Sequence, residues 1–138
     1  MFRFPKRKNS VVSEEVIDAL GFSYNEAEIA AMDRLGTRTE VPADTVIAAE
    51  GEFGSQAVVI LDGAAGVYRD GAEVATVGPA DVVGEGSLLT GKPRNASVVA
   101  KTPVDLVIFT TREFASLLDT CPRLKVQMKQ LVDERVPV

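Results

Sequence analysis

The sequence predicts a mainly β domain with flanking helices: an eight-stranded, jelly-roll-like β-roll preceded by N-terminal helices and followed by two C-terminal helices. Its 138 residues suit one domain with one hydrophobic interior. The 46% apolar and 25% charged content is that of a globular protein. Between about residues 37 and 111, short β-rich runs alternate with Gly, Pro and Asp, whereas the segments on either side carry helical periodicity.

The first twelve residues are expected to form a basic disordered tail, with the folded domain spanning 13–138. Four cations lie in this tail with no apolar run behind them, so it is neither a secretory signal nor a membrane span. Cys121 is the only cysteine, which excludes an internal disulfide and fits a reducing compartment. We therefore expect a cytoplasmic protein.

Two helices are predicted before the β region. Ser13 and the acids after it form an N-cap and first turn ahead of a helix that ends at Gly21. Asn25 precedes a second helix, which places Ile29, Met32 and Leu35 on one face and ends at Gly36.

Eight strands are predicted in the middle region, separated by turn residues such as Asp62-Gly63 and Asp70-Gly71. The predicted strands are 37–41, 45–49, 57–61, 66–69, 73–77, 81–83, 95–100 and 105–110.

Helical patterning returns over 112–136. One helix is predicted over 112–118 and a second over 122–136, with Pro122 at its start and an apolar stripe that includes Leu124, Met128 and Leu131.

Composition excludes several function classes. The chain has no histidine, so it lacks imidazole bases and histidine metal ligands, and we expect neither an enzyme nor a metal site. The net charge is −5, and without the four tail cations 11 basic residues face 20 acidic ones. A body this acidic is a poor partner for nucleic acid.

Residues 84–98 carry the densest departure from the β pattern, a glycine-bounded helical turn followed by a strand. A period of two from Arg94 puts its side chain on the apolar face of Ala96, Val98 and Ala100. A buried guanidinium needs an anion, either a protein carboxylate or a bound phosphate.

The residues beside Arg94 are compatible with both anions. Backbone N–H groups from Gly84 to Leu88 would form an anion cradle, and Glu85 could accept a hydrogen bond from a ribose hydroxyl. Phosphate and ribose together indicate a nucleotide. In the alternative, Glu85 and Arg94 pair with each other and the glycines only make turns.

These residues resemble the phosphate-binding cassette of cyclic nucleotide-binding domains, as found in catabolite-activator-type regulators, protein kinase A regulatory subunits and cyclic nucleotide-gated channels. That cassette has Gly-Glu, a Leu-Leu pair, and then Arg, a small residue and Ala. The matching segments here are Gly84-Glu85, Leu88-Leu89 and Arg94-Asn95-Ala96. The resemblance covers about residues 25–135.

The resemblance implies that the β-roll encloses a cyclic nucleotide, with Arg94 on the cyclic phosphate and Glu85 on the ribose 2′-hydroxyl. Asn95 stands where threonine is associated with cGMP, so cAMP is the first expectation and cGMP the second. No cofactor is implied. The candidate ligand-binding residues are Gly84, Glu85, Gly86, Ser87, Leu88, Arg94, Asn95 and Ala96.

The function that follows is a stand-alone cyclic-nucleotide sensor that signals to a partner protein in trans. The chain stops where the regulators continue into a DNA-binding domain and the kinase subunits into a second nucleotide domain. In this family the last helix could act as a lid over the base, or its stripe could be ordinary core. A second function stays open, because Gly86 and Asn95 depart from the family pattern and the cassette has no aromatic platform: a degenerate domain that serves as a protein-interaction module.

Overall fold

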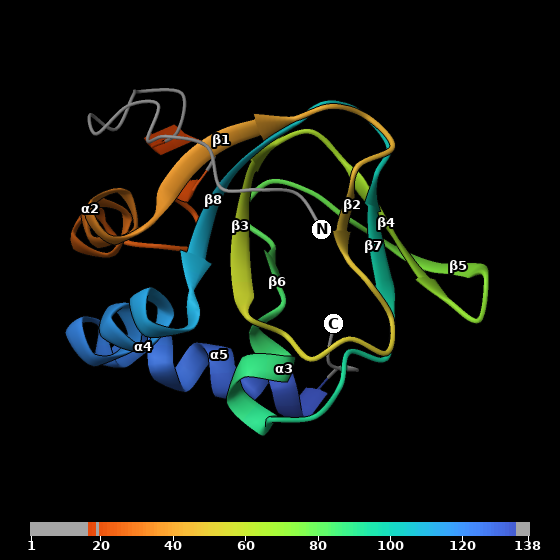
Figure 1. The fold of residues 1–138 in the computed structure, drawn as a ribbon. Coiled ribbons are helices and arrows are strands. Elements are labelled where there is room, and N and C mark those ends of the chain that lie inside the picture. Colours follow the sequence, from red (N-terminus) through yellow and green to blue (C-terminus); the bar gives the residue numbers. More distant parts are fainter. Residues whose placement is uncertain (1–16, 19, 135–138) are drawn as a thin grey trace.

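The computed structural model describes residues 17–18 and 20–134 (Figure 1). In this part of the chain, eight strands form two four-stranded antiparallel sheets, in the orders β1-β8-β3-β6 and β2-β7-β4-β5. The elements are α2 (Glu26–Leu35), β1 (Thr37–Val41), β2 (Val46–Ala48), β3 (Gln56–Asp62), β4 (Ala65–Arg69), β5 (Ala72–Val77), β6 (Val82–Val83), α3 (Glu85–Thr90), β7 (Ser97–Ala100), β8 (Val104–Thr110), α4 (Thr111–Thr120) and α5 (Pro122–Glu134).

The predicted fold class is confirmed, and each predicted strand overlaps an observed one. The prediction for the seventh strand was wrong at its start, since β7 begins at Ser97 and not at residue 95. The preceding residues pair with a loop instead of a strand: the Arg94 N–H donates to the Glu52 carbonyl at 2.8 Å. Helix α4 begins one residue earlier than predicted because Thr110 and Glu113 form a capping box.

Three predictions fall wholly or partly outside the described residues: the 1–12 tail, the helix start at Ser13 and the end of the last helix beyond residue 134. Ile17, Asp18 and Leu20 are helical, as predicted for the first helix. Within the described ranges, no helix is both long and apolar enough to cross a bilayer.

The β4–β5 hairpin illustrates how sequence sets the register. Arg69 pairs with Ala72, which leaves Asp70 and Gly71 as a two-residue turn. Both have positive φ, 52° and 82°, as a type I′ turn requires. Asp and Gly tolerate this conformation, so the Asp-Gly pair fixes where the chain reverses.

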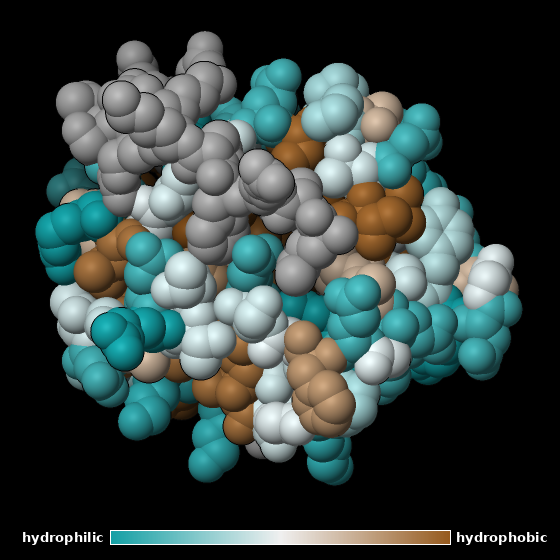
Figure 2. Space-filling view, viewed as in Figure 1, coloured by the Kyte–Doolittle hydropathy of each residue, from teal (hydrophilic) through white to brown (hydrophobic). Residues whose placement is uncertain are grey.

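Two hydrophobic clusters hold the fold together. One lies between the sheets and contains Val58, Ile60, Val98 and Leu106. The other lies under the helices and contains Val59, Phe109 and Leu124. On the face shown in Figure 2, visible apolar residues form separate areas among polar ones.

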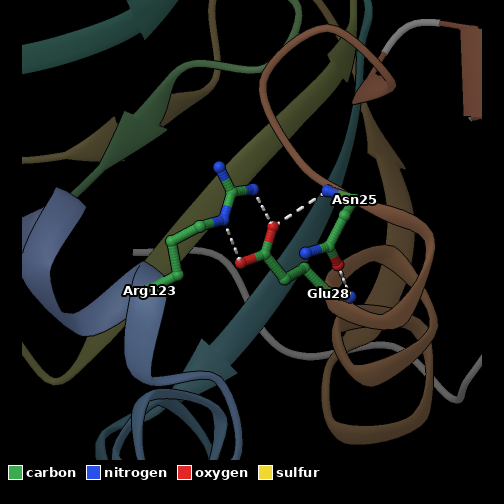
Figure 3. A network of polar contacts seen from close by, with 3 residues as sticks. All are labelled: Asn25, Glu28 and Arg123. Carbon is green, nitrogen blue, oxygen red and sulfur yellow. Dashed lines mark hydrogen bonds and ion pairs between the residues drawn. The ribbon is translucent and has the colours of Figure 1, made fainter.

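An ion pair joins α2 to the start of α5 (Figure 3). Asn25 caps α2, since its Oδ1 accepts from the Glu28 N–H and its own N–H donates to Glu28 Oε1, each at 2.8 Å. The Arg123 guanidinium makes two hydrogen bonds to the same carboxylate, Nε to Oε2 at 3.0 Å and Nη2 to Oε1. Glu28 is only 3% exposed, so Arg123 supplies the positive charge that this buried carboxylate needs.

Burial alone would raise the pKa of Glu28, but the hydrogen bonds from Arg123 and Asn25 and the Arg123 charge outweigh it and leave the pKa below its usual 4.5. A carboxyl with a lowered folded-state pKa stabilises the fold above its unfolded-state pKa. That contribution is lost as pH falls through the folded-state value.

We predict that Arg123→Gln lowers the Tm at neutral pH by about 3 °C. The deficit should shrink as the pH falls from 4.5 through the lowered folded-state pKa of Glu28, because the carboxyl is then protonated in both proteins. Thermal denaturation from pH 7 to pH 3 measures this, with Lys125→Gln, an exposed cation on the same helix, as the matched control. A deficit that does not change with pH, or that equals the control's, would contradict the role assigned to the pair.

Candidate functional site

Helix α3 is a single short helix between two glycines that lies against α5 (Figure 1). Gly84 precedes it with φ 94° and Gly91 ends it with φ 71°, both left-handed conformations. The Gly91 N–H closes the helix by donating to the Ser87 carbonyl at 2.9 Å. A residue with a Cβ would be strained at either end, so the two glycines fix the length of α3.

Arg94 follows α3 and is only 5% exposed. Its Nη2 donates to the Gln56 carbonyl at 2.9 Å, whereas its Nη1 has no hydrogen-bond partner among the described residues. Glycines flank the guanidinium: a Cβ on Gly84 would lie 2.8 Å from Nη1, and one on Gly54 would lie 2.9 Å from Nη2. These two glycines therefore create the slot that Arg94 fills.

A direct ion pair between Glu85 and Arg94 is not formed. Ion pairs within 4 Å in the described part of the chain include those of Arg38 with Asp105, Lys101 with Glu73 and Arg123 with Glu28, and none is found between Glu85 and Arg94. Glu85 is the first residue of α3 and is 1% exposed, and it acts on the guanidinium through space.

Burial lowers the pKa of Arg94, and the negative charges of Glu52 and then Glu85 offset only part of this effect. Glu52 is not among the site residues predicted from sequence. Its place near Arg94 is visible only in the fold, where its loop pairs with the residues around Arg94: the Gly51 N–H donates to the Arg94 carbonyl at 2.6 Å, and Phe53 forms a β-bridge with Pro93.

The Ser87 side chain ties this loop to α3. Its hydroxyl accepts from the Gly54 N–H at 2.8 Å and donates to the Lys92 carbonyl at 2.7 Å. The hydroxyl thus has protein partners on both sides. The first N–H groups of an α-helix have no acceptor within the helix, so those of Gly86 and Ser87 are the groups that α3 can offer to an anion.

Of the three remaining candidates, two pack in different hydrophobic clusters. Ala96 is fully buried between the sheets, whereas Leu88 is half-buried and packs on the helical cluster. Asn95 belongs to neither cluster: its carbonyl accepts from Arg69 Nε at 3.3 Å, and its side-chain Oδ1 is buried without a hydrogen-bond partner in the described part of the chain. Burial of Arg94, Ala96, Val98 and Ala100 agrees with the predicted inward face.

Nothing in the described part of the chain groups three or more His, Cys, Asp or Glu side chains in a way that could hold a metal ion. The chemistry available around Arg94 is therefore that of a buried cation, two nearby carboxylates and backbone N–H groups. These groups can bind and orient an anion that also carries hydroxyls.

Among curated proteins, the chain is 37% identical over 98 residues to a cAMP-dependent protein kinase regulatory subunit from Aspergillus niger, covering 69% of this chain and 23% of that protein. It is 31% identical over 134 residues to the Pycsar effector protein PaPycTIR from Pseudomonas aeruginosa, covering 95% of this chain and 44% of that protein. The chain thus spans less than half the length of these relatives.

Among solved structures, the catabolite activator protein of Thermus thermophilus matches with a TM-score of 0.72 and 24% identity, over 85% of this chain and 57% of that one. This likeness concerns the fold. The family model described as "Cyclic nucleotide-binding domain" matches residues 38–121, more than half of the chain, from the second residue of β1 to just past the end of α4. The chain belongs to the cyclic nucleotide-binding domain family.

Proposed function

We propose that this domain binds a cyclic nucleoside monophosphate and signals its presence to a partner protein. The ligand expected first is cAMP, and cGMP is the alternative. The observation that carries the proposal is the buried Arg94 guanidinium, whose Nη1 has no hydrogen-bond partner among the described residues. An unmatched buried cation is costly, and a bound phosphate would satisfy it.

Each candidate residue then has a role that its position allows. Arg94 binds the cyclic phosphate, with the Gly86 and Ser87 N–H groups at the start of α3 as further donors. Glu85, beside them at the first position of α3, accepts a hydrogen bond from the ribose 2′-hydroxyl. The other residues that we propose to line the ligand site are Gly84, Leu88, Asn95 and Ala96.

The proposed domain is a sensor and not an enzyme, because its sequence offers no imidazole for acid–base or nucleophilic chemistry. Helix α3 packs against α5, so a ligand that shifts α3 would alter the placement of α5. We propose that the partner protein reads this displacement.

A second candidate function is a protein-interaction module that no longer binds nucleotide. The observation in its favour is the closed packing of the site, in which Glu85 is 1% and Arg94 5% exposed. Capture of the same partners with and without added cAMP would favour this function, whereas nucleotide-dependent capture would favour the sensor.

We predict that isothermal titration gives micromolar or tighter binding of cAMP, and that Arg94→Ala weakens it by about 100-fold through loss of a charged hydrogen-bond donor. Arg94→Lys should recover only part of the affinity, because an ammonium lacks the guanidinium fork. Arg112→Ala, which removes an exposed cation from α4, is the control. Thermal denaturation checks that each variant is folded, and wild-type affinity in a folded Arg94→Ala protein would refute the proposed phosphate site.

We also predict that Gly54→Ala weakens cAMP binding by about 10-fold, since the new Cβ would lie 2.8 Å from Ser87 Cβ and 2.9 Å from Arg94 Nη2, so that both must move. Gly78→Ala is the matched control, because the Cβ there would meet only a carbonyl oxygen at 3.6 Å. Titration compares the two, and equal affinities would show that the slot does not position Arg94 for the ligand.

A further inference from the structure

The loop before β3 holds Glu52 next to Arg94. The Arg94 N–H donates to the Glu52 carbonyl at 2.8 Å, the Gly51 N–H donates to the Arg94 carbonyl at 2.6 Å, and Phe53 bridges to Pro93. These backbone contacts fix the place of Glu52 relative to Arg94 even though its side chain is exposed. The backbone of Glu52 is therefore held beside that of Arg94, and its carboxylate acts on the guanidinium electrostatically.

The Glu52 carboxylate acts on Arg94 at a distance. None of the ion pairs within 4 Å in the described ranges includes either residue. Even so, Glu52 exerts a larger electrostatic effect on Arg94 than Glu85 does. Glu52 also lines a small cavity of about 20 Å³ together with β2 and Ala49. Ala48 of β2 pairs with Val98 in the strand after Arg94.

Arg94 thus has two negative charges acting on it, those of Glu52 and Glu85. This balance affects different phosphate groups unequally. A cyclic phosphodiester carries one negative charge, whereas the phosphomonoester of an open nucleotide carries about −1.5 to −2 at neutral pH. Because Coulomb repulsion is proportional to the ligand charge, a fixed carboxylate repels the monoester about twice as strongly as the diester.

We propose that Glu52 is a specificity-determining residue that favours the singly charged cyclic phosphate over the doubly charged phosphate of an open nucleoside monophosphate. This inference rests on the proposed function, since it presumes that the phosphate lies at Arg94. Glu52 acts by repulsion, so it lowers the affinity for every anion and lowers that for dianions most.

The test compares wild type, Glu52→Gln and Glu50→Gln. Glu50 is an exposed acid in the same loop and does not contribute to the electrostatic shift at Arg94. Each protein is titrated with three ligands: cAMP, 5′-AMP and the methyl ester of 5′-AMP, an open nucleotide with a single negative charge. Weak ligands are measured by displacement of a fluorescent cyclic nucleotide.

We expect Glu52→Gln to raise the affinities for cAMP and for the methyl ester by a similar factor, about 3-fold. The affinity for 5′-AMP should rise by about the square of that factor, about 10-fold. Both gains should shrink when ionic strength rises from about 0.05 M to about 0.5 M. Glu50→Gln should leave the ratio of the cAMP and 5′-AMP affinities at its wild-type value.

Two results would overturn the inference while leaving the proposed function in place. One is that Glu52→Gln changes the affinities for cAMP and 5′-AMP by the same factor. An unchanged cAMP affinity with 5′-AMP binding still undetectable counts as this result. The other is that Glu50→Gln shifts the ratio equally. A folded wild-type protein that binds none of the three ligands would instead overturn the proposed function, and this inference with it.

Discussion

The burial of one guanidinium, that of Arg94, constrains the loop before β3, the start of β3 and the residue before α3. Arg94 can occupy its place only because Gly54 and Gly84 carry no side chain where its nitrogens lie. It keeps that place because the Gln56 carbonyl at the start of β3 accepts from it. The local geometry of three separate chain segments therefore follows from accommodating one cation, which the fold would otherwise exclude from its interior.

Most of the fold could be predicted from local pattern, because alternation, turn residues and caps act over a few neighbours. The start of β7 could not. Arg94 and Ala96 alternate in burial with Asn95 as strand residues do, yet the hydrogen bonds of Arg94 go to a loop. The periodicity of burial predicts which way side chains face, but it does not predict which segment pairs with the backbone, because that depends on the tertiary fold.

The site was predictable in part for a similar reason. Glycines around a short helix and an arginine on an apolar face are local signals, and they led to residues 84–96. Glu52 had no such signal, because an exposed glutamate in a turn looks like any solvated side chain until the fold brings its loop to Arg94. The same holds for Glu28 and Arg123, which lie on distant helices and meet only in the folded chain.

The net charge of the chain also bears on how an anionic ligand would reach Arg94. The whole chain has a net charge of −5, so a distant anion is not drawn in by the overall field. Recognition of the proposed ligand would therefore arise at contact with the buried Arg94 guanidinium and the N–H groups at the start of α3. Such a site would gain selectivity from the geometry of its donors, and its association rate would be lower than that of an electrostatically steered site.

The sheet that contains β3 and β8 has consequences for mechanics. Val58 and Ile60 of β3 face the interior of the roll, while Ala57, Val59 and Leu61 face the helices; β8 alternates in the same way. A sheet packed tightly on both faces transmits displacement from one face to the other, because dense packing leaves little free space to absorb it. Pressure from a molecule filling the roll would thus reach the helical layer as movement of whole strands.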